Sequence, residues 1–253
     1  MQKTLTEEQY LYLLAIMFQR LFKTVNLGSE YQDIYFLKNI IRPGDHCVDI
    51  GAHLGYYTFQ FSRLVGEKGK VIAIEPVSKF KNILQKIIHR KKIKNIELHQ
   101  VALGGKGEFV EMGIPRINNQ KKYGYARMRE TFEDLEYAET EKVKNVSGNE
   151  LLANLTRLDF IKCDVEGAEV QVFTSLLIVV EQHKPVLLCE LLDKNELRKM
   201  YSMLGPLTYQ IYILKNNKLH KIDTQSSEHP ISHNYYFIPD ARRPVLNQVF
   251  AGR

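Results

Sequence analysis

The stretch His46-Cys-Val-Asp-Ile-Gly-Ala-His-Leu-Gly-Tyr-Tyr57 runs from apolar residues through an acid into two closely spaced glycines. We interpret it as a buried strand over residues 46–50, then a tight turn, then the start of a helix. Such a turn offers backbone N–H groups to a polar ligand at the carboxyl end of a strand. The other segments are placed around this predicted ligand site.

Short apolar segments alternate with helical segments from residue 46 onward. The spacing of apolar residues predicts helices at Tyr57–Val65 and Lys79–His89. This alternation is typical of βαβ units and predicts an α/β fold with a doubly wound, mostly parallel sheet and helices on both faces. The last two strands are expected to form an antiparallel pair, because no convincing helix separates them. The expected strands are His46–Ile50, Lys70–Ile74, Ile96–Val101, Leu158–Cys163, Val186–Cys189, Gln210–Leu214 and Tyr235–Ile238.

Two helices are expected before the first strand. Thr6 and Gln9 have the spacing of a capping box, which predicts a helix that continues to about Phe22. A second helix is predicted over Tyr31–Ile41, because Pro43 and the glycine after it end the helical pattern. Their expected role is to cover the sheet or to roof the site.

The chain has 253 residues, 44% of them hydrophobic, which suits one large domain with an insertion. We assign residues 1–42 to an N-terminal helical extension, 43–240 to the main domain and 241–253 to a C-terminal tail. The segment Gly113–Gly148 is rich in charge and poor in aliphatic residues. It is predicted to be either a mobile lid over the site or a partly disordered insertion.

The cysteines and the N-terminal segment indicate the class of protein. Cys47, Cys163 and Cys189 each lie in an apolar run without C-x-x-C spacing, which predicts buried reduced thiols rather than metal ligands. The apolar stretch Leu11–Phe18 is too short to span a bilayer, and it follows acidic rather than basic residues. We therefore expect a soluble, cytoplasmic protein with no transmembrane segment and no signal peptide.

The formal net charge of +6 and the isoelectric point near 9.0 permit an anionic substrate or nucleic acid. Net charge informs on solubility and encounter only. The main basic cluster, over residues 79–94, alternates with apolar residues at helical spacing. It is therefore interpreted as the solvated face of an amphipathic helix.

Acidic residues close the expected strands. Ligands of doubly wound sheets bind outside the carboxyl ends of the strands, so these acids are the candidate site residues. They are Asp49, Glu75, Asp164 with Glu166, and Glu190.

The glycine turn after Asp49 differs from the dinucleotide fingerprint. Gly51 and Gly55 have the spacing G-x-x-x-G instead of G-x-G-x-x-G. A carboxylate at Asp49 would repel a pyrophosphate but would hold an ammonium, which favours an amino-acid-bearing cofactor such as S-adenosylmethionine. The alternative is that the glycines serve packing alone.

Glu75 follows Gly55 by twenty positions and ends the second expected strand. An acid at this place is able to accept hydrogen bonds from both hydroxyls of an adenosine ribose. The alternative is that Glu75 and Pro76 only begin the next helix.

A family resemblance rests mainly on one run, Ile161-Lys-Cys-Asp-Val-Glu-Gly-Ala-Glu169. Together with Asp49–Gly55, Glu75-Pro76, Pro185–Glu190 and Asn234–Pro239 it closely resembles the FkbM family of S-adenosylmethionine-dependent methyltransferases. The resemblance covers roughly residues 40–240.

The resemblance implies a class I methyltransferase fold, with a seven-stranded sheet of which one strand is antiparallel. It also implies O-methylation of a hydroxyl on a sugar of a glycolipid or polysaccharide, or on a polyketide-type molecule. A small hydroxylated acceptor is therefore expected, and nucleic acid is not. The predicted cofactor-binding residues are Asp49, Gly51, Ala52, His53, Gly55, Tyr57, Glu75, Pro76, Ala102 and Asp164.

Two positions depart from the family pattern. His53 stands where the family usually has a small amide residue, which affects contacts around the methionine part of the cofactor. Asn149-Glu150 replaces an acid-rich pair before the fourth strand, and this change is expected to concern helix capping more than chemistry.

Methyl transfer needs alignment of donor and acceptor and removal of the hydroxyl proton. Asp164 and Glu166 are predicted either to act as general base and orienting group, or to hold a divalent cation such as Mg²⁺ together with Glu190. Asp164 is also placed to contact the amino-acid end of the cofactor. Glu190 needs a partner if it is buried, and Lys162, a metal or a substrate hydroxyl would serve. His53 is the alternative base.

Two other functions remain open. An RNA or small-molecule N-methyltransferase suits the positive charge, but the run after Asp164 lacks the proline and aromatic residues that grip a planar amine. A cofactor-binding protein without turnover would bind the donor and methylate nothing. The sequence does not identify the acceptor.

Overall fold

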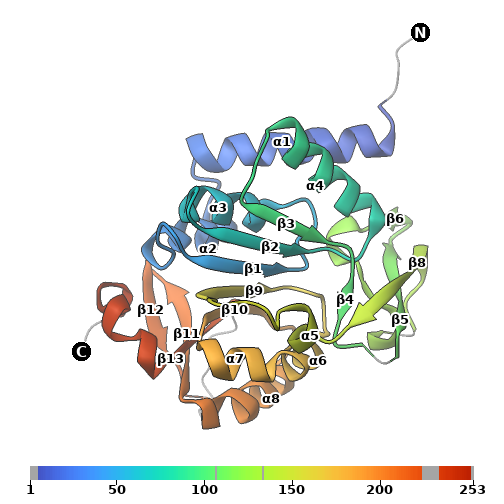
Figure 1. The fold of residues 1–253 in the computed structure, drawn as a ribbon. Helices are drawn as coiled ribbons and strands as arrows, with labels where there is room; N and C mark the ends of the chain where they lie inside the picture. The colour runs from blue at the N-terminus through green and yellow to red at the C-terminus, as the bar shows by residue number, and fades with distance from the viewer. Residues whose placement is uncertain (1–4, 106, 133, 224–233, 252–253) are drawn as a thin grey trace.

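A central β-sheet with helices on both faces forms the body of the molecule, and a smaller sheet lies at one end of it (Figure 1). The structure is a computed structural model that describes residues 5–105, 107–132, 134–223 and 234–251. The expected α/β class with a mostly parallel sheet is confirmed. No helix within the described ranges is long and apolar enough to cross a membrane.

The central sheet has eight strands. These are β1 (His46–Ile50), β2 (Lys70–Ile74), β3 (Ile96–His99), β9 (Phe160–Cys163), β10 (Val186–Glu190), β11 (Tyr209–Lys215), β12 (Lys218–Lys221) and β13 (Asn234–Pro239). Their order is β12-β11-β13-β10-β9-β1-β2-β3. The pairs from β10 through β9, β1 and β2 to β3 are parallel, whereas β13 runs antiparallel to both β10 and β11.

The expectation of seven strands was wrong by one, because β12 extends the edge of the sheet. The turn between β11 and β12 contains Asn216 and Asn217, with φ of 52° and 58°. Two successive residues of positive φ form a type I′ hairpin turn, which asparagine tolerates. Two strand boundaries differ by two residues: β3 ends at His99 instead of Val101, and β9 begins at Phe160 instead of Leu158. The strands β10, β11 and β13 are longer than expected by one residue at one or both ends.

Helices cover the two faces of the central sheet. One face carries α3 (Tyr56–Val65) and α4 (Ser78–Arg90), and the other carries α6 (Glu169–Ser175), α7 (Leu177–His183) and α8 (Lys194–Leu204), with the short α5 (Gly148–Leu151) beside them (Figure 1). Val48, Ile161 and Leu187 lie opposite one another on adjacent strands and pack against Phe173 of α6. Since successive side chains of a strand face opposite ways, Cys47 packs on the α3 side. All three cysteines are free and buried, as predicted.

The N-terminal extension is one long helix followed by a short irregular one. In α1 (Glu7–Thr24), Thr6 and Gln9 form the predicted capping box. The second predicted helix is instead α2 (Gln32–Phe36) between two 3-10 turns, η1 (Ser29–Tyr31) and η2 (Leu37–Asn39).

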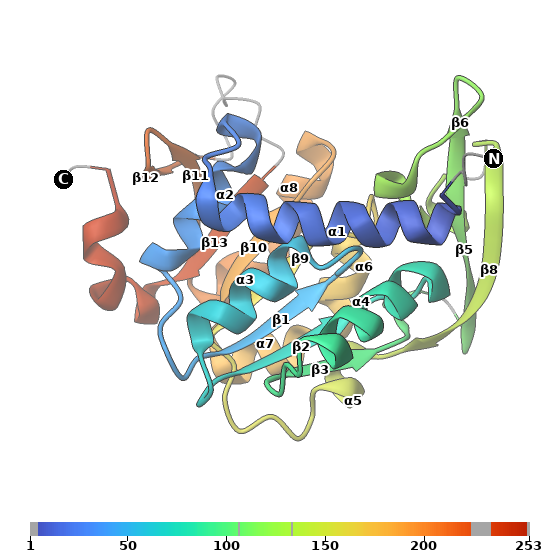
Figure 2. The same cartoon turned by 90° about the horizontal axis from the view of Figure 1, so that it is seen from above.

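Seen from above, α1 lies across α3 and α4, and its first turn approaches the smaller sheet (Figure 2). There Glu7 pairs with Lys79 of α4 and, at 2.8 Å, with Lys121. Both lysines also pair with Glu139, at 2.6 and 2.5 Å. This charge cluster ties the N-terminal helix to the body of the molecule and to the smaller sheet.

The smaller sheet contains most of the segment that was predicted to be a lid or a partly disordered insertion. Its strands are β4 (Ala102–Leu103), β5 (Phe109–Ile117), β6 (Gln120–Lys121), β7 (Arg127–Met128) and β8 (Tyr137–Val146), with 3-10 turns η3 (Tyr123–Tyr125) and η4 (Arg129–Thr131) between them. Val110, Met112 and Ile114 alternate along β5 and are buried. The described part of this segment thus consists mainly of β-strands joined by 3-10 turns, and whether it moves as a lid stays a prediction.

The C-terminal residues pack on the edge of the central sheet. The 3-10 helices η6 (Asp240–Arg242) and η7 (Pro244–Val249) follow β13, and Leu246 and Val249 are buried. Phe250 forms a β-bridge with Leu219 of β12. The predicted division into extension, main domain and tail stays a prediction.

Candidate active site

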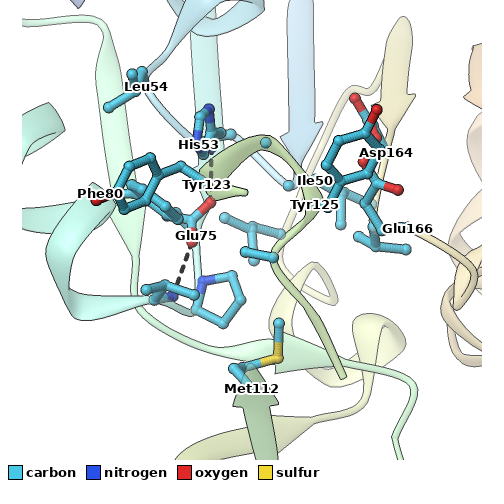
Figure 3. Close-up of a pocket in the computed structure, with 18 of the residues that line it drawn as sticks. Ile50, His53, Leu54, Glu75, Phe80, Met112, Tyr123, Tyr125, Asp164 and Glu166 are labelled. Atoms are coloured by element: carbon cyan, nitrogen blue, oxygen red, sulfur yellow. Dashed lines mark hydrogen bonds between the residues drawn. The ribbon is translucent and has the colours of Figure 1, made fainter. Parts of the chain in front are cut away.

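A cavity of about 580 Å³ lies at the carboxyl ends of β1, β2, β9 and β10. Its walls also include Tyr10 and Leu14 of α1 and Tyr123 and Tyr125 of η3. In Figure 3, His53, Glu75, Phe80 and Tyr123 are grouped on one side of the pocket, and Asp164, Glu166 and Tyr125 on the other. The sequence-predicted residues that line the cavity are Asp49, Gly51, Ala52, His53, Tyr57, Glu75, Pro76, Ala102, Asp164, Glu166 and Glu190.

The two glycines of the first turn have different surroundings. A Cβ on Gly51, whose φ is +79°, would lie 1.8 Å from the backbone oxygen of Asp164, so the turn touches the end of β9. A Cβ on Gly55 would collide with Leu84 and Phe59. Gly55 does not line the cavity. It allows α3 to pack against α4.

Asp49 is the last residue but one of β1 and is fully buried. Its Oδ2 accepts a hydrogen bond of 2.5 Å from the hydroxyl of Thr58 in α3. Burial raises the pKa of Asp49 to about 6, while the positive charge of Lys162 and the Thr58 hydrogen bond act in the opposite direction. The Asp49 carboxylate is therefore held by Thr58 of α3 and faces the cavity with its charge partly balanced.

Glu75 directly follows β2 and binds the backbone of the first turn and of the start of α4. Its Oε2 accepts the backbone N–H of His53 at 2.7 Å, and its Oε1 accepts that of Val77 at 2.8 Å (Figure 3). Val77 is the N-cap residue of α4, so Glu75 does help to begin that helix, as the alternative interpretation held. A carboxylate has about four acceptor positions, so two remain for a ligand. Burial raises its pKa to about 7.

His53 lies in the turn with φ of 47°, a left-handed conformation that is uncommon for a residue other than glycine. Its ring packs 4.2 Å from the ring of Phe80, and its Nε2 is buried without a hydrogen-bond partner among the described residues. Burial lowers the pKa of His53 to about 4, so the ring is neutral at neutral pH. It belongs to the Glu75 side of the pocket and not to the Asp164 side (Figure 3).

Asp164 follows β9 and is paired with a buried lysine of the same strand. Nζ of Lys162 lies 2.5 Å from Oδ2 of Asp164 and 4.8 Å from the centre of the Tyr57 ring. Asp164, Asp49 and Glu190 together raise the pKa of Lys162 above its usual range despite its burial. The buried Lys162 ammonium thus lines the cavity and is stabilised by the charges of three carboxylates.

Glu166 lies two residues further on and is paired with the smaller sheet. Nη2 of Arg127 in β7 donates to Oε2 of Glu166 at 3.0 Å, and both side chains are almost buried. Burial and the negative charge of Asp164 raise the pKa of Glu166 to about 8, and Arg127 counteracts this rise. The carboxyls of Asp164 and Glu166 therefore have separate cationic partners, Lys162 and Arg127.

Glu169 holds the loop that carries both acids. Its two carboxylate oxygens accept the backbone N–H groups of Val165 and Gly167 at 2.9 and 3.0 Å. It is fully buried and does not line the cavity. Glu169 thus has a structural role in this loop.

Comparison with known families identifies the fold and its chemistry. A family model described as the methyltransferase FkbM domain matches residues 49–217, from the acid of the first turn to the hairpin after β11. The chain belongs to the FkbM methyltransferase family. As an FkbM protein it is a methyltransferase that depends on S-adenosylmethionine, and the expected class I fold is confirmed.

Solved structures similar to this FkbM protein include three methyltransferases. The methyltransferase FkbM from Methylobacillus flagellatus KT has 19% identity and a TM-score of 0.48, over 89% of this chain and 58% of that one. An S-adenosylmethionine-dependent O-methyltransferase from Thermotoga maritima has 13% identity and a TM-score of 0.47, over 88% and 69%. Precorrin-6y C5,15-methyltransferase from Geobacter metallireducens GS-15 has 12% identity and a TM-score of 0.47, over 85% and 89%. No curated protein matches the chain.

The geometry gives the expected divalent cation no support. Within the described parts of this FkbM protein, no three or more His, Cys, Asp or Glu side chains form a group that could hold a metal ion. Asp164 and Glu166, two of the three expected ligands, have Lys162 and Arg127 as cationic partners instead.

The sequence analysis missed several residues that surround the cavity. Thr58 and Arg127 are bonded to predicted site residues, and Tyr10, Tyr123 and Tyr125 form part of the wall. Thr58 was detectable, because it lies on the first turns of the helix after the glycine motif. The others come from elements whose position over the site no local pattern reveals.

Proposed function

We propose that this protein transfers the methyl group of S-adenosylmethionine to a hydroxyl oxygen of a polyhydroxylated small molecule. A sugar of a glycolipid or polysaccharide, or a polyketide-type product, is the acceptor class we propose. The observation that carries the proposal is the pair of neighbouring carboxyls after β9, Asp164 and Glu166, each with its own buried cationic partner. Two neighbouring acids allow one to orient the acceptor while the other removes the proton from its hydroxyl.

The donor half of the cavity suits the proposed cofactor. Glu75 has free acceptor positions for the two ribose hydroxyls, and Asp49 offers a carboxylate to an ammonium group. Ala52, His53, Pro76 and the Ala102 region are assigned to the same ligand because they line this half. Bound S-adenosylmethionine supplies an electrophilic methyl carbon on a positively charged sulfur.

The acceptor half supplies orientation and a base. Lys162 holds the Asp164 carboxylate in place, so that Asp164 is able to accept a hydrogen bond from the acceptor and align it. Glu166 takes the hydroxyl proton while the acceptor oxygen bonds to the methyl carbon and the carbon–sulfur bond breaks. A base whose pKa is about 8 is matched to this step near neutral pH. Glu190 is assigned to the acceptor side because it lines the cavity there.

The mechanism requires no metal ion, because the positive charges beside the two acids come from the chain itself. We also propose that the reaction takes place in the cytoplasm. The three unpaired cysteines support this location, since disulfides are rare in reducing compartments.

The first test is calorimetry with S-adenosylhomocysteine, followed by transfer of a labelled methyl group to a panel of sugars and polyols. The proposal predicts a product that survives mild base, as an ether does and a methyl ester does not. E166Q should lower kcat about 10²- to 10⁴-fold, the usual contribution of a general base. E150Q, which changes an exposed acid of the same kind outside the cavity, is the matched control.

Three results would contradict the proposal. A folded protein that fails to bind S-adenosylhomocysteine would remove the donor assignment. Labelled RNA or a methylated amine as the product would favour the N-methyltransferase alternative. Donor binding without any labelled product from cell extracts would favour a cofactor-binding protein without turnover.

A further inference from the structure

We propose that Arg127, which the smaller sheet contributes, is a positioning residue for methyl transfer: it orients the Glu166 carboxylate toward the acceptor and keeps it ready to take a proton. This inference rests on the proposed role of Glu166. It assigns a catalytic purpose to the inserted sheet beyond covering the pocket.

The position of Arg127 is set by backbone pairing. It lies in β7 opposite Gly113 of β5, in an antiparallel pair. Its side chain is buried, with a relative exposure of 7% for the residue. A buried guanidinium needs partners for its charge and its donors, and here Nη2 donates to Glu166 and Nε donates to the carbonyl oxygen of Tyr125 at 3.1 Å. The sheet therefore delivers a cation whose direction is fixed at two points.

Aromatic rings hold the guanidinium plane. The guanidinium carbon of Arg127 lies 4.6 Å from the centre of the Phe132 ring and 5.9 Å from that of Tyr125. Arginine makes such contacts through its flat face while its edge donates hydrogen bonds, and lysine does not combine the two. The site is thus specific for arginine rather than for any positive charge.

The partner loop is equally constrained. Glu166 has φ of +61°, and the next residue, Gly167, has φ of +103°. A Cβ on Gly167 would lie 2.8 Å from the Phe132 ring, so the loop and the inserted segment pack closely at this point. A carboxylate on a strained backbone beside a close neighbour has few orientations, and the ion pair selects one of them.

Arg127 also changes the charge balance at Glu166. The charged groups that act on this carboxyl are Asp164 after β9, Arg127, Glu190 at the end of β10, and Glu169 in α6. The three acids oppose its ionisation, and Arg127 favours it. Without the guanidinium, burial and three negative neighbours would leave Glu166 protonated over a wider pH range.

The test compares R127M and R127K with wild type, using R129M as the matched control. Arg129 is the neighbouring arginine, and it pairs with Glu111 in a largely exposed contact. For R127M we expect kcat/KM at pH 7 to fall about tenfold or more, and the rise of activity with pH to move up by about one pH unit. Affinity for S-adenosylhomocysteine should stay within about twofold. R127K should restore the pH profile in part, and R129M should match wild type.

A second measurement does not depend on turnover. The folded protein keeps a proton on Glu166, with pKa about 8, that the unfolded chain releases near the ordinary value of 4.5. Wild type should therefore lose thermal stability relative to E166Q as the pH rises from 4.5, and the difference should level off near pH 8. The same difference in thermal stability, measured between R127M and R127M/E166Q, should level off at a higher pH than it does between wild type and E166Q.

The outcomes separate this inference from the proposed function. If wild type shows no methyl transfer but the levelling-off moves in R127M, the ion pair acts as inferred and the reaction is misassigned. If R127M keeps the wild-type pH dependence of both stability and activity, Arg127 does not tune Glu166 and the inference fails. Should R127M not fold, the same two comparisons in R127Q, which also lacks the charge, decide.

Discussion

The Thr58 hydroxyl donates a hydrogen bond of 2.5 Å to Oδ2 of Asp49 in the interior of the molecule. The bond joins the first helix after the glycine turn to the acid near the carboxyl end of β1. This hydrogen bond favours the ionised form of Asp49, as does the backbone N–H of Thr58. Helix α3 therefore helps to prepare the carboxylate that we assign to the donor's ammonium group.

Replacing Thr58 by valine should weaken donor binding. Valine keeps the shape of the side chain but leaves Asp49 without its hydroxyl donor, and hydrogen bonds to charged groups contribute about 1.5–3 kcal/mol. We expect affinity for S-adenosylhomocysteine to fall about tenfold or more in T58V, measured by calorimetry. T58S keeps the hydroxyl and should bind nearly as wild type does. Equal affinity of T58V and wild type would show that Asp49 does not contact the donor.

Gly51 should tolerate no side chain. A Cβ there would lie 1.8 Å from the backbone oxygen of Asp164, so G51A must displace the ends of β1 and β9 as well as accept a positive φ. G44A is the control, because Gly44 also has positive φ but nothing within 4 Å of an added Cβ. We expect G44A to cost about 1–2 kcal/mol from backbone strain. G51A should cost about 1–3 kcal/mol more and abolish donor binding.

Thermal denaturation and calorimetry of the two glycine variants provide the comparison. If G51A and G44A were equally stable and both bound S-adenosylhomocysteine, the close contact between the first turn and β9 would be wrong.

Glu75 should be sensitive to loss of a single acceptor. In E75Q the amide N–H₂ would face one of the two backbone N–H groups that the carboxylate accepts, leaving a donor unsatisfied at a cost of about 1–3 kcal/mol. Donor affinity should fall about 10- to 100-fold. E97Q, on the neighbouring strand β3 and half-exposed, is the control and should change affinity less than twofold. A wild-type affinity in E75Q would exclude the ribose assignment.

Donor affinity should rise with pH and then level off. Asp49 and Glu75 have pKa values of about 6 and 7, raised by burial, and the assigned contacts with an ammonium and two hydroxyls favour their ionised forms. Binding therefore releases protons below these values, and the dissociation constant of S-adenosylhomocysteine should decrease from pH 5.5 to about 7 and change little above it. In E75Q the part of this dependence near pH 7 should disappear. A dissociation constant that is flat across the range would contradict both assignments.

Much of the central fold could be predicted because its signals are local. The apolar runs of β1, β2 and β10 each end at an acid, and parallel strands place such ends along one edge. Eleven of the twelve distinct site residues named from the sequence line one cavity, while Gly55 lies outside it. Parallel strands have their carboxyl ends at the same edge of the sheet, and this alone brings those residues together.

The smaller sheet could not be predicted from local patterns of apolar residues. Strand β8 is composed largely of charged and polar residues, because one side of this sheet faces solvent. Asn118 and Asn119, with φ of 50° and 59°, form a second type I′ hairpin turn of the same kind as the one at Asn216 and Asn217. Each pair of asparagines lies between segments rich in charged residues, and this composition did not indicate the strands of a hairpin.

The contacts between distant elements were beyond any sequence pattern. Arg127 and Glu166 are 39 positions apart and belong to different sheets. Their pairing depends on how the smaller sheet is placed over the carboxyl end of β9. That placement results from tertiary packing, as does the contact of Glu7 with Lys121.

Glu169 fastens the loop that carries Asp164 and Glu166 by binding the N–H groups of Val165 and Gly167. The loop thus takes its final shape when the chain folds, not when an acceptor arrives, and binding entails no further loss of backbone entropy there. Acceptors of different shape can then be selected by changes in the smaller sheet and α1 alone. The same rigid pair of acids would serve each of them, so diversification of substrates in such a protein need not disturb its reaction chemistry.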